Sequence, residues 1–124
     1  MVNFDGLFLN RNEPENFCNG LCNGKSTMSA QDSLNYNPTG RDLSERTISL
    51  DGWQAYSQLH LDTHNVYGTM QVKATYNWFE MVKQRPMIMS SSAFSGMGKF
   101  GSRWLGDNYS TAQFMGLSVT GVMA

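Results

Sequence analysis

Charged residues are scarce in this sequence, and those present nearly balance. Asp, Glu, Lys and Arg make up 15% of the 124 residues, and the net charge at pH 7 is −1. Nucleic acids and anionic membranes attract clustered positive charge, so neither is predicted as a partner. No apolar run approaches the roughly 18 residues that a membrane span requires. The composition is typical of one soluble globular domain.

The N-terminus lacks the features of a signal peptide. Met1 is followed by Val2-Asn3-Phe4-Asp5, without a charged first segment or a long apolar core. The sequence therefore carries no signal for a secretory route, and the compartment is not determined by it.

Cysteine is also scarce, which limits the metal sites and disulfides that the chain can form. The two cysteines, Cys18 and Cys22, lie in a stretch rich in Gly and Asn. A structural zinc site needs four ligands, and His60 and His64 are far away in the sequence. We therefore predict no metal site and no cofactor. Two alternatives remain, a local disulfide in an oxidising compartment or two reduced thiols.

Two short apolar runs, residues 4–10 and 87–89, are typical of strands that are buried on both faces of a parallel sheet. Residues 102–106 are predicted to form a third strand. A long polar stretch, residues 15–50, follows the first run and contains turn pairs such as Asn37-Pro38. A stretch of this length inside a compact domain is typical of a functional loop or an insertion.

Residues 64–83 have the periodicity of an amphipathic helix. We expect Asp62 or Thr63 to cap this helix, and Pro86 lies just beyond its end. A second helix of about a dozen residues is predicted after a cap at Ser110, broken or ended by Gly116 and Gly121. One apolar stripe of the first helix is predicted to be buried at Tyr67, Met70, Ala74 and Trp78, and Met81 continues the same stripe.

Strands separated by helical stretches predict parallel β/α units. Polar side chains stand where the predicted strands end, at Asn10, at 90–92 and at Asp107. In a TIM-type barrel this edge carries the active site.

Several motifs in chain order resemble the catalytic barrel of glycoside hydrolase family thirty-one, the retaining α-glucosidases of the sucrase and maltase type. The motifs are Asp5-Gly6-Leu7-Phe8-Leu9-Asn10-Arg11-Asn12-Glu13-Pro14, Asp62-Thr63-His64-Asn65-Val66-Tyr67-Gly68, Lys73-Ala74-Thr75-Tyr76, Arg85-Pro86-Met87-Ile88-Met89-Ser90, and Arg103-Trp104-Leu105-Gly106-Asp107-Asn108 followed by Ser110-Thr111. Each is suggestive alone, and their order and spacing together identify the family.

The resemblance implies an α/β fold, namely a partial (β/α)8 barrel with about three of the eight β/α units. A full barrel takes about 250 residues. We therefore expect one domain over residues 1–124, with a long loop at about 15–60 after the first strand. Three parallel strands alone leave two open edges and an uncovered face. The rest of a barrel, or protein partners covering 4–10 and 102–106, would close them.

The family pattern assigns the two catalytic positions. Its acid/base Asp falls on Asp107, and its nucleophilic Asp falls on Asn10. Retaining glycosidases need both carboxyl groups, about 5–5.5 Å apart. An Asn side chain has no anionic oxygen for attack, so we expect this chain to be inactive.

The resemblance also assigns substrate-binding positions. Arg11 stands where the family has Met, Lys99 stands where an Arg commonly contacts substrate, and Trp104 is the tryptophan expected to face a glucose. Lys99 keeps the charge but lacks the bidentate guanidinium.

Two functional hypotheses follow. The first is an α-glucosidase-like fragment, of the class that hydrolyses α-linked glucosides with retention, which is inactive because of Asn10. The second is a non-catalytic structural or accessory subunit of a larger assembly, derived from a glycosidase. A sugar-binding pseudoenzyme is a third, weaker alternative.

Overall fold

The computed structural model describes residues 4–23 and 43–123. The chain divides into two compact units, one made of Met1–Glu13 and Val66–Ala124 and the other of Pro14–Asn65. The turn predicted at Asn37-Pro38 lies outside the described residues.

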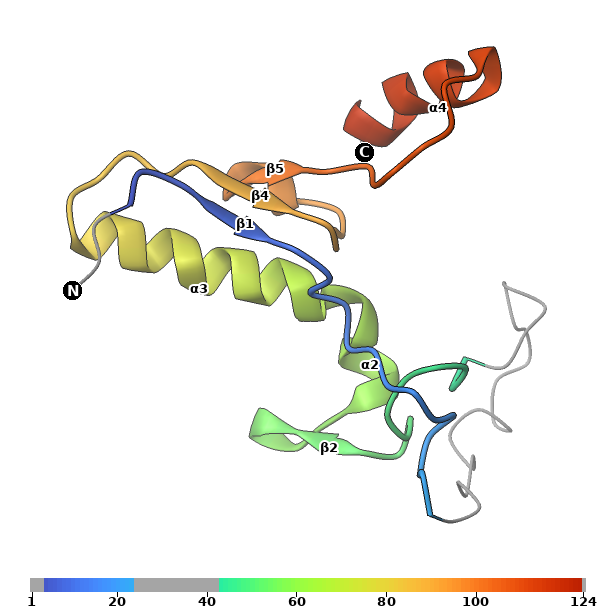
Figure 1. Ribbon diagram of the computed structural model, residues 1–124. Coiled ribbons are helices and arrows are strands. Elements are labelled where there is room, and N and C mark those ends of the chain that lie inside the picture. Colours follow the sequence, from blue (N-terminus) through green and yellow to red (C-terminus); the bar gives the residue numbers. More distant parts are fainter. Residues whose placement is uncertain (1–3, 24–42, 124) are drawn as a thin grey trace. The chain divides into compact units, whose positions relative to one another are not determined.

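The first unit is built on a three-stranded parallel sheet (Figure 1). The strands are β1 (Leu7–Leu9), β4 (Ile88–Ser90) and β5 (Ser102–Arg103), in the order β1-β4-β5. Both pairings are parallel, with Phe8 opposite Met89 and Met89 opposite Ser102. The predicted parallel arrangement of the three strands is therefore confirmed. The described sheet is open, and a closed barrel is not seen in it.

Helix α3 (Tyr67–Met81) lies along one face of this sheet, as Figure 1 shows. Leu7 and Leu9 of β1 pack against the same core as Ile88 of β4. Successive side chains of a strand point to opposite faces, so Phe8 points to the other face of the sheet. The buried core joins both elements and consists of Val72, Phe79, Ile88 and Met97, with Phe4, Leu7, Leu9, Tyr76, Trp78 and Phe100 packed around it.

The predicted helix is confirmed, but its predicted buried stripe is wrong. Tyr67 and Met70 are 47% and 55% exposed, and Ala74 is exposed as well. The buried positions of α3 are Gly68, Val72 and Phe79. Apolar residues occupy more than one side of this helix, so periodicity alone does not select the face that packs. Trp78 of the predicted stripe does join the core, as a half-buried neighbour of Phe4 and Phe79.

The start and end of α3 also differ from the prediction. The helix follows Val66, which gives no side-chain cap, and the Thr63 hydroxyl donates to the Leu59 carbonyl in the preceding turn. At the other end Lys83 has φ 56°, and the Gln84 N–H donates to the Phe79 carbonyl at 3.1 Å. This is a Schellman ending, with Lys in the left-handed position that glycine usually takes.

The third strand is shorter than the predicted 102–106. β5 ends at Arg103, and Gly106 has a φ of 88°, in the region that favours glycine. The chain therefore turns before Asp107, which lies in a bend beyond the strand and not at its tip.

The C-terminal helix α4 (Ala112–Met123) runs through Gly116 and Gly121 without a break, contrary to the prediction. Its first turn is capped by Thr111, whose hydroxyl accepts the Phe114 N–H at 3.3 Å, and not by Ser110. None of the residues of this helix is buried.

The second unit contains short elements only. An antiparallel pair, β2 (Trp53–Gln54) and β3 (Gln58–Leu59), is joined by the 3-10 turn η1 (Ala55–Ser57). The turn of helix α2 (His60–Thr63) follows, and η2 (His64–Val66) leads to α3. An isolated bridge pairs Glu15 with Thr47. The stretch predicted as a long loop thus contains local structure of its own.

Candidate functional site

The candidate site lies at the edge of the parallel sheet where β1, β4 and β5 end. Parallel strands place their carboxyl ends at one edge, so the segments that follow them are neighbours. Those segments are residues 10–12, 91–92 and 104–107. The predicted site residues Asn10, Arg11, Trp104 and Asp107 all belong to these segments.

Asn12 binds the ends of β1 and β4 together. Its Nδ2 donates to the Ser90 hydroxyl at 2.8 Å, and its Oδ1 accepts the Ser91 hydroxyl at 3.0 Å and the Ser92 N–H at 2.8 Å. The Ser90 hydroxyl donates onward to the Ser92 carbonyl at 2.8 Å. Asn12 is 7% exposed and Ser90 is fully buried. A buried side-chain amide is stable only when its donor and acceptor are both used, as they are here.

Gly68 at the start of α3 completes this cluster. A Cβ on Gly68 would lie 2.5 Å from the Ser92 side chain and 3.1 Å from Asn12 Nδ2. The absence of a side chain therefore lets the helix approach the polar cluster at the strand ends. The first turn of α3 is tied to the same loop, because the Thr69 hydroxyl accepts the Phe94 N–H at 3.0 Å.

Asn10 and Arg11 form the turn that directly follows β1, and both side chains are exposed. Arg11 has φ 48°, a left-handed conformation that is uncommon for residues other than Gly, Asn and Asp. The turn brings the chain from the exposed Asn10 to the buried Asn12 in two residues. Asn10 therefore stands at the surface of the site, on a backbone fixed by the hydrogen bonds of Asn12.

Trp104 is brought next to β1 through an aromatic contact. Its indole and the Phe8 ring meet at 88°, with centroids 5.1 Å apart. The backbone N–H of Trp104 extends the sheet by donating to the Ser90 carbonyl at 2.8 Å. Phe8 alternates with Leu7 and Leu9, so this aromatic pair lies on the sheet face opposite α3. Phe8 is 46% exposed there.

Lys99 and Asp107 are the other two predicted site residues. Lys99 ends the 3-10 turn η3 (Met97–Lys99), with its Nζ 5.8 Å from the centre of the Phe100 ring. Asp107 is exposed, in the bend after Gly106. The structure thus places Lys99 in the loop between β4 and β5, and Asp107 after β5.

Asn12 is the site residue that the sequence interpretation missed. The sequence locates the polar residues at the end of the second predicted strand but does not identify their partner. The available signal is Asn12 itself, whose side chain has both a donor and an acceptor and stands two residues past the end of an apolar run.

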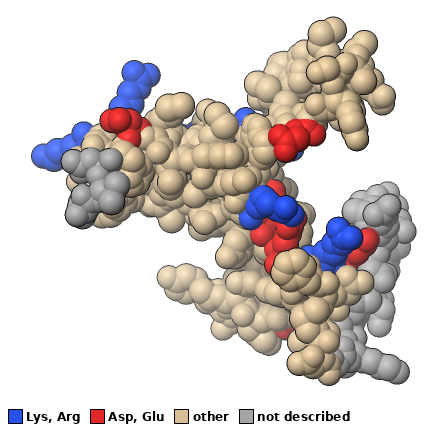
Figure 2. All heavy atoms as spheres, in the orientation of Figure 1, with Lys and Arg blue, Asp and Glu red and all other residues tan. Residues whose placement is uncertain are grey.

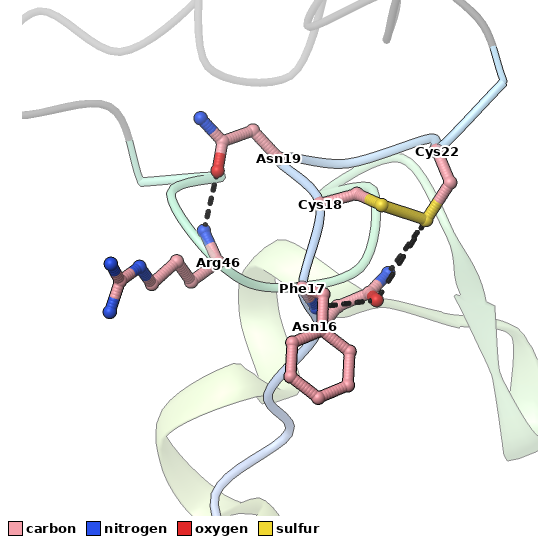
Figure 3. The surroundings of a disulfide bond; sticks show 6 residues. All are labelled: Asn16, Phe17, Cys18, Asn19, Cys22 and Arg46. Carbon is pink, nitrogen blue, oxygen red and sulfur yellow. Dashed lines mark hydrogen bonds between the residues drawn. A yellow bond between two sulfur atoms is a disulfide. The ribbon is translucent and has the colours of Figure 1, made fainter.

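A disulfide joins Cys18 and Cys22 in the second unit, with 5.1 Å between their Cα atoms (Figure 3). Of the two alternatives left open by the sequence, the structure therefore contains the disulfide. Asn16 lies beside it, with its Nδ2 3.7 Å from the Cys22 sulfur and its Oδ1 accepting the Phe17 N–H at 2.8 Å.

His60 is fully buried in the same unit. Its Nε2 lies 3.1 Å from the Thr47 hydroxyl, and its Nδ1 lies 3.1 Å from Gln54 Nε2. Burial, and in second place the nearby His64 imidazole, lower the pKa of His60 below its ordinary 6.5. The two rings meet at 69°, with centroids 5.2 Å apart.

Within residues 4–23 and 43–123, no group of three or more His, Cys, Asp or Glu side chains is arranged to hold a metal ion. Of the described helices, none combines the length and apolar character needed to cross a membrane.

Comparison with known proteins matches the whole chain to one family. The family model described as the glycosyl hydrolases family 31 TIM-barrel domain covers residues 1–124. Intestinal sucrase-isomaltase of Homo sapiens is 34% identical over 98% of this chain. Lysosomal alpha-glucosidase of Bos taurus is 32% identical over 98% of it, and alpha-xylosidase 1 of Arabidopsis thaliana is 30% identical over 97%. The chain spans 7%, 13% and 16% of these three relatives.

Proposed function

The chain belongs to the TIM-barrel domain family of the glycosyl hydrolases of family 31, and from this premise we propose that it carries the two catalytic positions of an α-glucosidase-like barrel but not the activity. The substrate class of the ancestor would be an α-linked glucoside. The relatives include proteins named for sucrose, isomaltose, α-glucosides and α-xylosides, so the finer choice of sugar is left to experiment.

The observation that carries this proposal is the position of Asn10. It stands in the turn at the end of β1, where the family resemblance places the nucleophile. Retention requires a carboxylate that attacks the anomeric carbon and a second carboxyl group about 5–5.5 Å away that protonates the leaving oxygen. An amide cannot supply the attacking oxygen, and it also removes the negative charge that stabilises an oxocarbenium-like transition state.

Asp107 is the acid/base candidate in this scheme. Its exposed position beyond β5 is consistent with contact to a leaving group, and Trp104 lies on the same segment. A general acid alone contributes about 10²–10⁴-fold, which does not replace a covalent step. An intact Asp107 therefore does not offset the loss at residue 10.

Two candidate substrate-contact residues, Arg11 and Lys99, also support the proposal that the chain is inactive. Arg11 puts a cation directly beside Asn10, at a position where the family pattern has an uncharged Met. Lys99 presents a single ammonium where an Arg would offer a planar pair of donors to sugar hydroxyls. These substitutions weaken the recognition of a neutral glucoside.

A non-catalytic subunit role is the second candidate, and a separate observation favours it. The sheet face opposite α3 exposes Phe8, and β1 and β5 each have one unpaired side in the described sheet. A face and edges of this kind are suited to another protein surface.

Turnover of an aryl α-glucoside tests the first proposal. We expect no release of the aryl alcohol by the unchanged chain. Asn10→Asp should also stay inactive, because a TIM-type site is built from loops after eight strands and this sheet supplies three. Hydrolysis by the unchanged chain that is lost in Asp107→Asn would overturn the proposal, since Asp107 would then be working with a nucleophile other than residue 10.

A further inference from the structure

The second unit has a polar interior. Leu50 is its one buried apolar residue among those described, whereas Ser44, Thr47 and His60 are buried polar residues. The described part of this unit therefore buries little apolar surface. Hydrogen bonds and the Cys18–Cys22 disulfide supply the other contacts that hold it together.

The hydrogen bonds around His60 fix one form of its imidazole. The Thr47 hydroxyl donates its single proton to the Pro14 carbonyl, so its oxygen accepts from His60 Nε2–H. Gln54 Nε2 is a donor, so His60 Nδ1 carries a lone pair. The neutral imidazole therefore donates to the Thr47 hydroxyl and accepts from the Gln54 amide, and Thr47 holds its Nε2–H in place.

The loop closed by the disulfide holds the backbone of Thr47 in place. The N–H of the buried Gly20 donates to the Thr47 carbonyl at 2.9 Å, and Asn19 Oδ1 accepts the Arg46 N–H at 2.9 Å. Gly20 and Asn19 both lie between Cys18 and Cys22, as Figure 3 shows for Asn19. Gly20 adopts a φ of 70°. The cross-link therefore restrains the two residues that position the turn at 46–47.

We infer that the Cys18–Cys22 disulfide is a redox latch on the buried His60. While it is closed, residues 19 and 20 keep Thr47 against the imidazole, and its reduction loosens that turn and admits solvent to the ring. Cys22 is exposed, so a soluble dithiol can reach the bond. One thiolate of the dithiol attacks a sulfur, and its second thiol resolves the mixed disulfide. The chain then gains two thiols, and the dithiol leaves as its cyclic disulfide.

His64 is the ionisable residue that faces the His60 ring. It lies on η2, and a positive charge on it opposes protonation of His60. The other charged residues that the structure describes in this unit are exposed or half-buried, namely Glu15, Glu45, Arg46, Asp51 and Asp62. None of these is a cause of the lowered pKa of His60.

Carbethoxylation of histidine by diethyl pyrocarbonate, mapped by peptide mass spectrometry, tests the latch. The full chain is labelled with the disulfide closed, and again after dithiothreitol and alkylation of the thiols. We expect labelling of His60 to rise by about tenfold or more on reduction, as local opening exposes it. His64 is half-buried in the oxidised protein and serves as the internal reference, with a change under about twofold.

Two variants separate the latch from general unfolding. Cys18→Ser with Cys22→Ser should show high His60 labelling with or without dithiothreitol. Asn19→Ala keeps the disulfide but removes the acceptor for Arg46, and should raise His60 labelling while the bond stays closed. Persistent protection of His60 once both thiols are alkylated would overturn the inference. So would an equal rise at His60 and His64, because the unit would then open as a whole.

Discussion

Asn10 and Asn12 stand two residues apart in one turn and have opposite surroundings. Asn10 is exposed, whereas Asn12 is buried with hydrogen bonds to three consecutive serines. Asn12 holds the shape of the sheet edge, and Asn10 is the position for which we propose a catalytic ancestry. We expect a substitution at residue 10 to leave the fold undisturbed, because the Asn10 side chain is exposed.

Replacement of Asn12 by Ala should lower the free energy of unfolding by about 1–3 kcal/mol, the cost of leaving the Ser92 N–H without its acceptor. Asn10→Ala is the matched control in the same turn, with an expected change within about 0.5 kcal/mol. Urea unfolding followed by tryptophan fluorescence measures both. Equal losses in the two variants would show that the Asn12 cluster is not what holds the strand ends.

His60 predicts a pH dependence at the residue scale. Its pKa in the folded chain lies below the unfolded value of 6.5, so the unfolded state binds more protons between the two values. Stability of the second unit should be full above 6.5 and decrease as pH falls toward the lowered folded pKa. Hydrogen exchange of the 44–61 backbone at about pH 7.5 and about pH 5.5 measures this. His60→Gln should abolish most of the difference.

At the scale of elements, the sequence predicted the order of the strands and helices of the first unit but not which face of α3 is buried, and it predicted none of the short elements of the second unit. The apolar runs around Leu7 and Ile88 located β1 and β4, because a strand buried on both faces has a continuous apolar pattern. The buried face of α3 was missed, because apolar residues lie on several sides of the helix and the choice among them depends on packing of Val72 and Phe79 against the distant Ile88 and Met97. Likewise, no local pattern encodes the hydrogen bond from Gly20 to Thr47.

The observed packing of α3 is tested by two substitutions on the same helix. Phe79→Ala removes a fully buried ring from the core and should cost about 3–5 kcal/mol. Met70→Ala changes an exposed side chain and should cost less than about 1 kcal/mol. Urea midpoints of both variants against the unchanged chain give the comparison. A larger loss for Met70→Ala would restore the stripe predicted from periodicity.

At the scale of the whole molecule, the chain exposes much apolar surface and little charge. The large apolar residues that α4 exposes are Phe114, Met115, Leu117, Val119, Val122 and Met123. No Lys, Arg, Asp or Glu belongs to this helix, and Figure 2 shows its surface without charged groups. In a (β/α)8 barrel the sheet face opposite the helices is filled by layers of side chains, and here that face exposes Phe8.

We therefore predict that the purified chain is not a stable monomer of 13.9 kDa. Unpaired edges of β1 and β5 favour pairing with other chains, and the apolar face favours burial. Size-exclusion chromatography with light scattering should give oligomers, aggregates or co-purified proteins. Lysine introduced at the face, as Phe8→Lys, should reduce this association relative to Met70→Lys on α3. A sharp monomer peak with a cooperative melt would contradict the prediction.

The proposed absence of a nucleophile at residue 10 is tested most directly by covalent trapping. A fluorinated α-glucosyl fluoride reacts with the carboxylate nucleophile of a retaining α-glucosidase, which displaces fluoride and forms a glycosyl ester that hydrolyses slowly. An active family 31 α-glucosidase in a parallel reaction shows that the reagent works. This chain should keep its unmodified mass of 13.9 kDa, because Asn10 offers no carboxylate. A glycosyl adduct mapped to Asp5 or Glu13 would contradict this account, since another carboxylate would then occupy the attacking position.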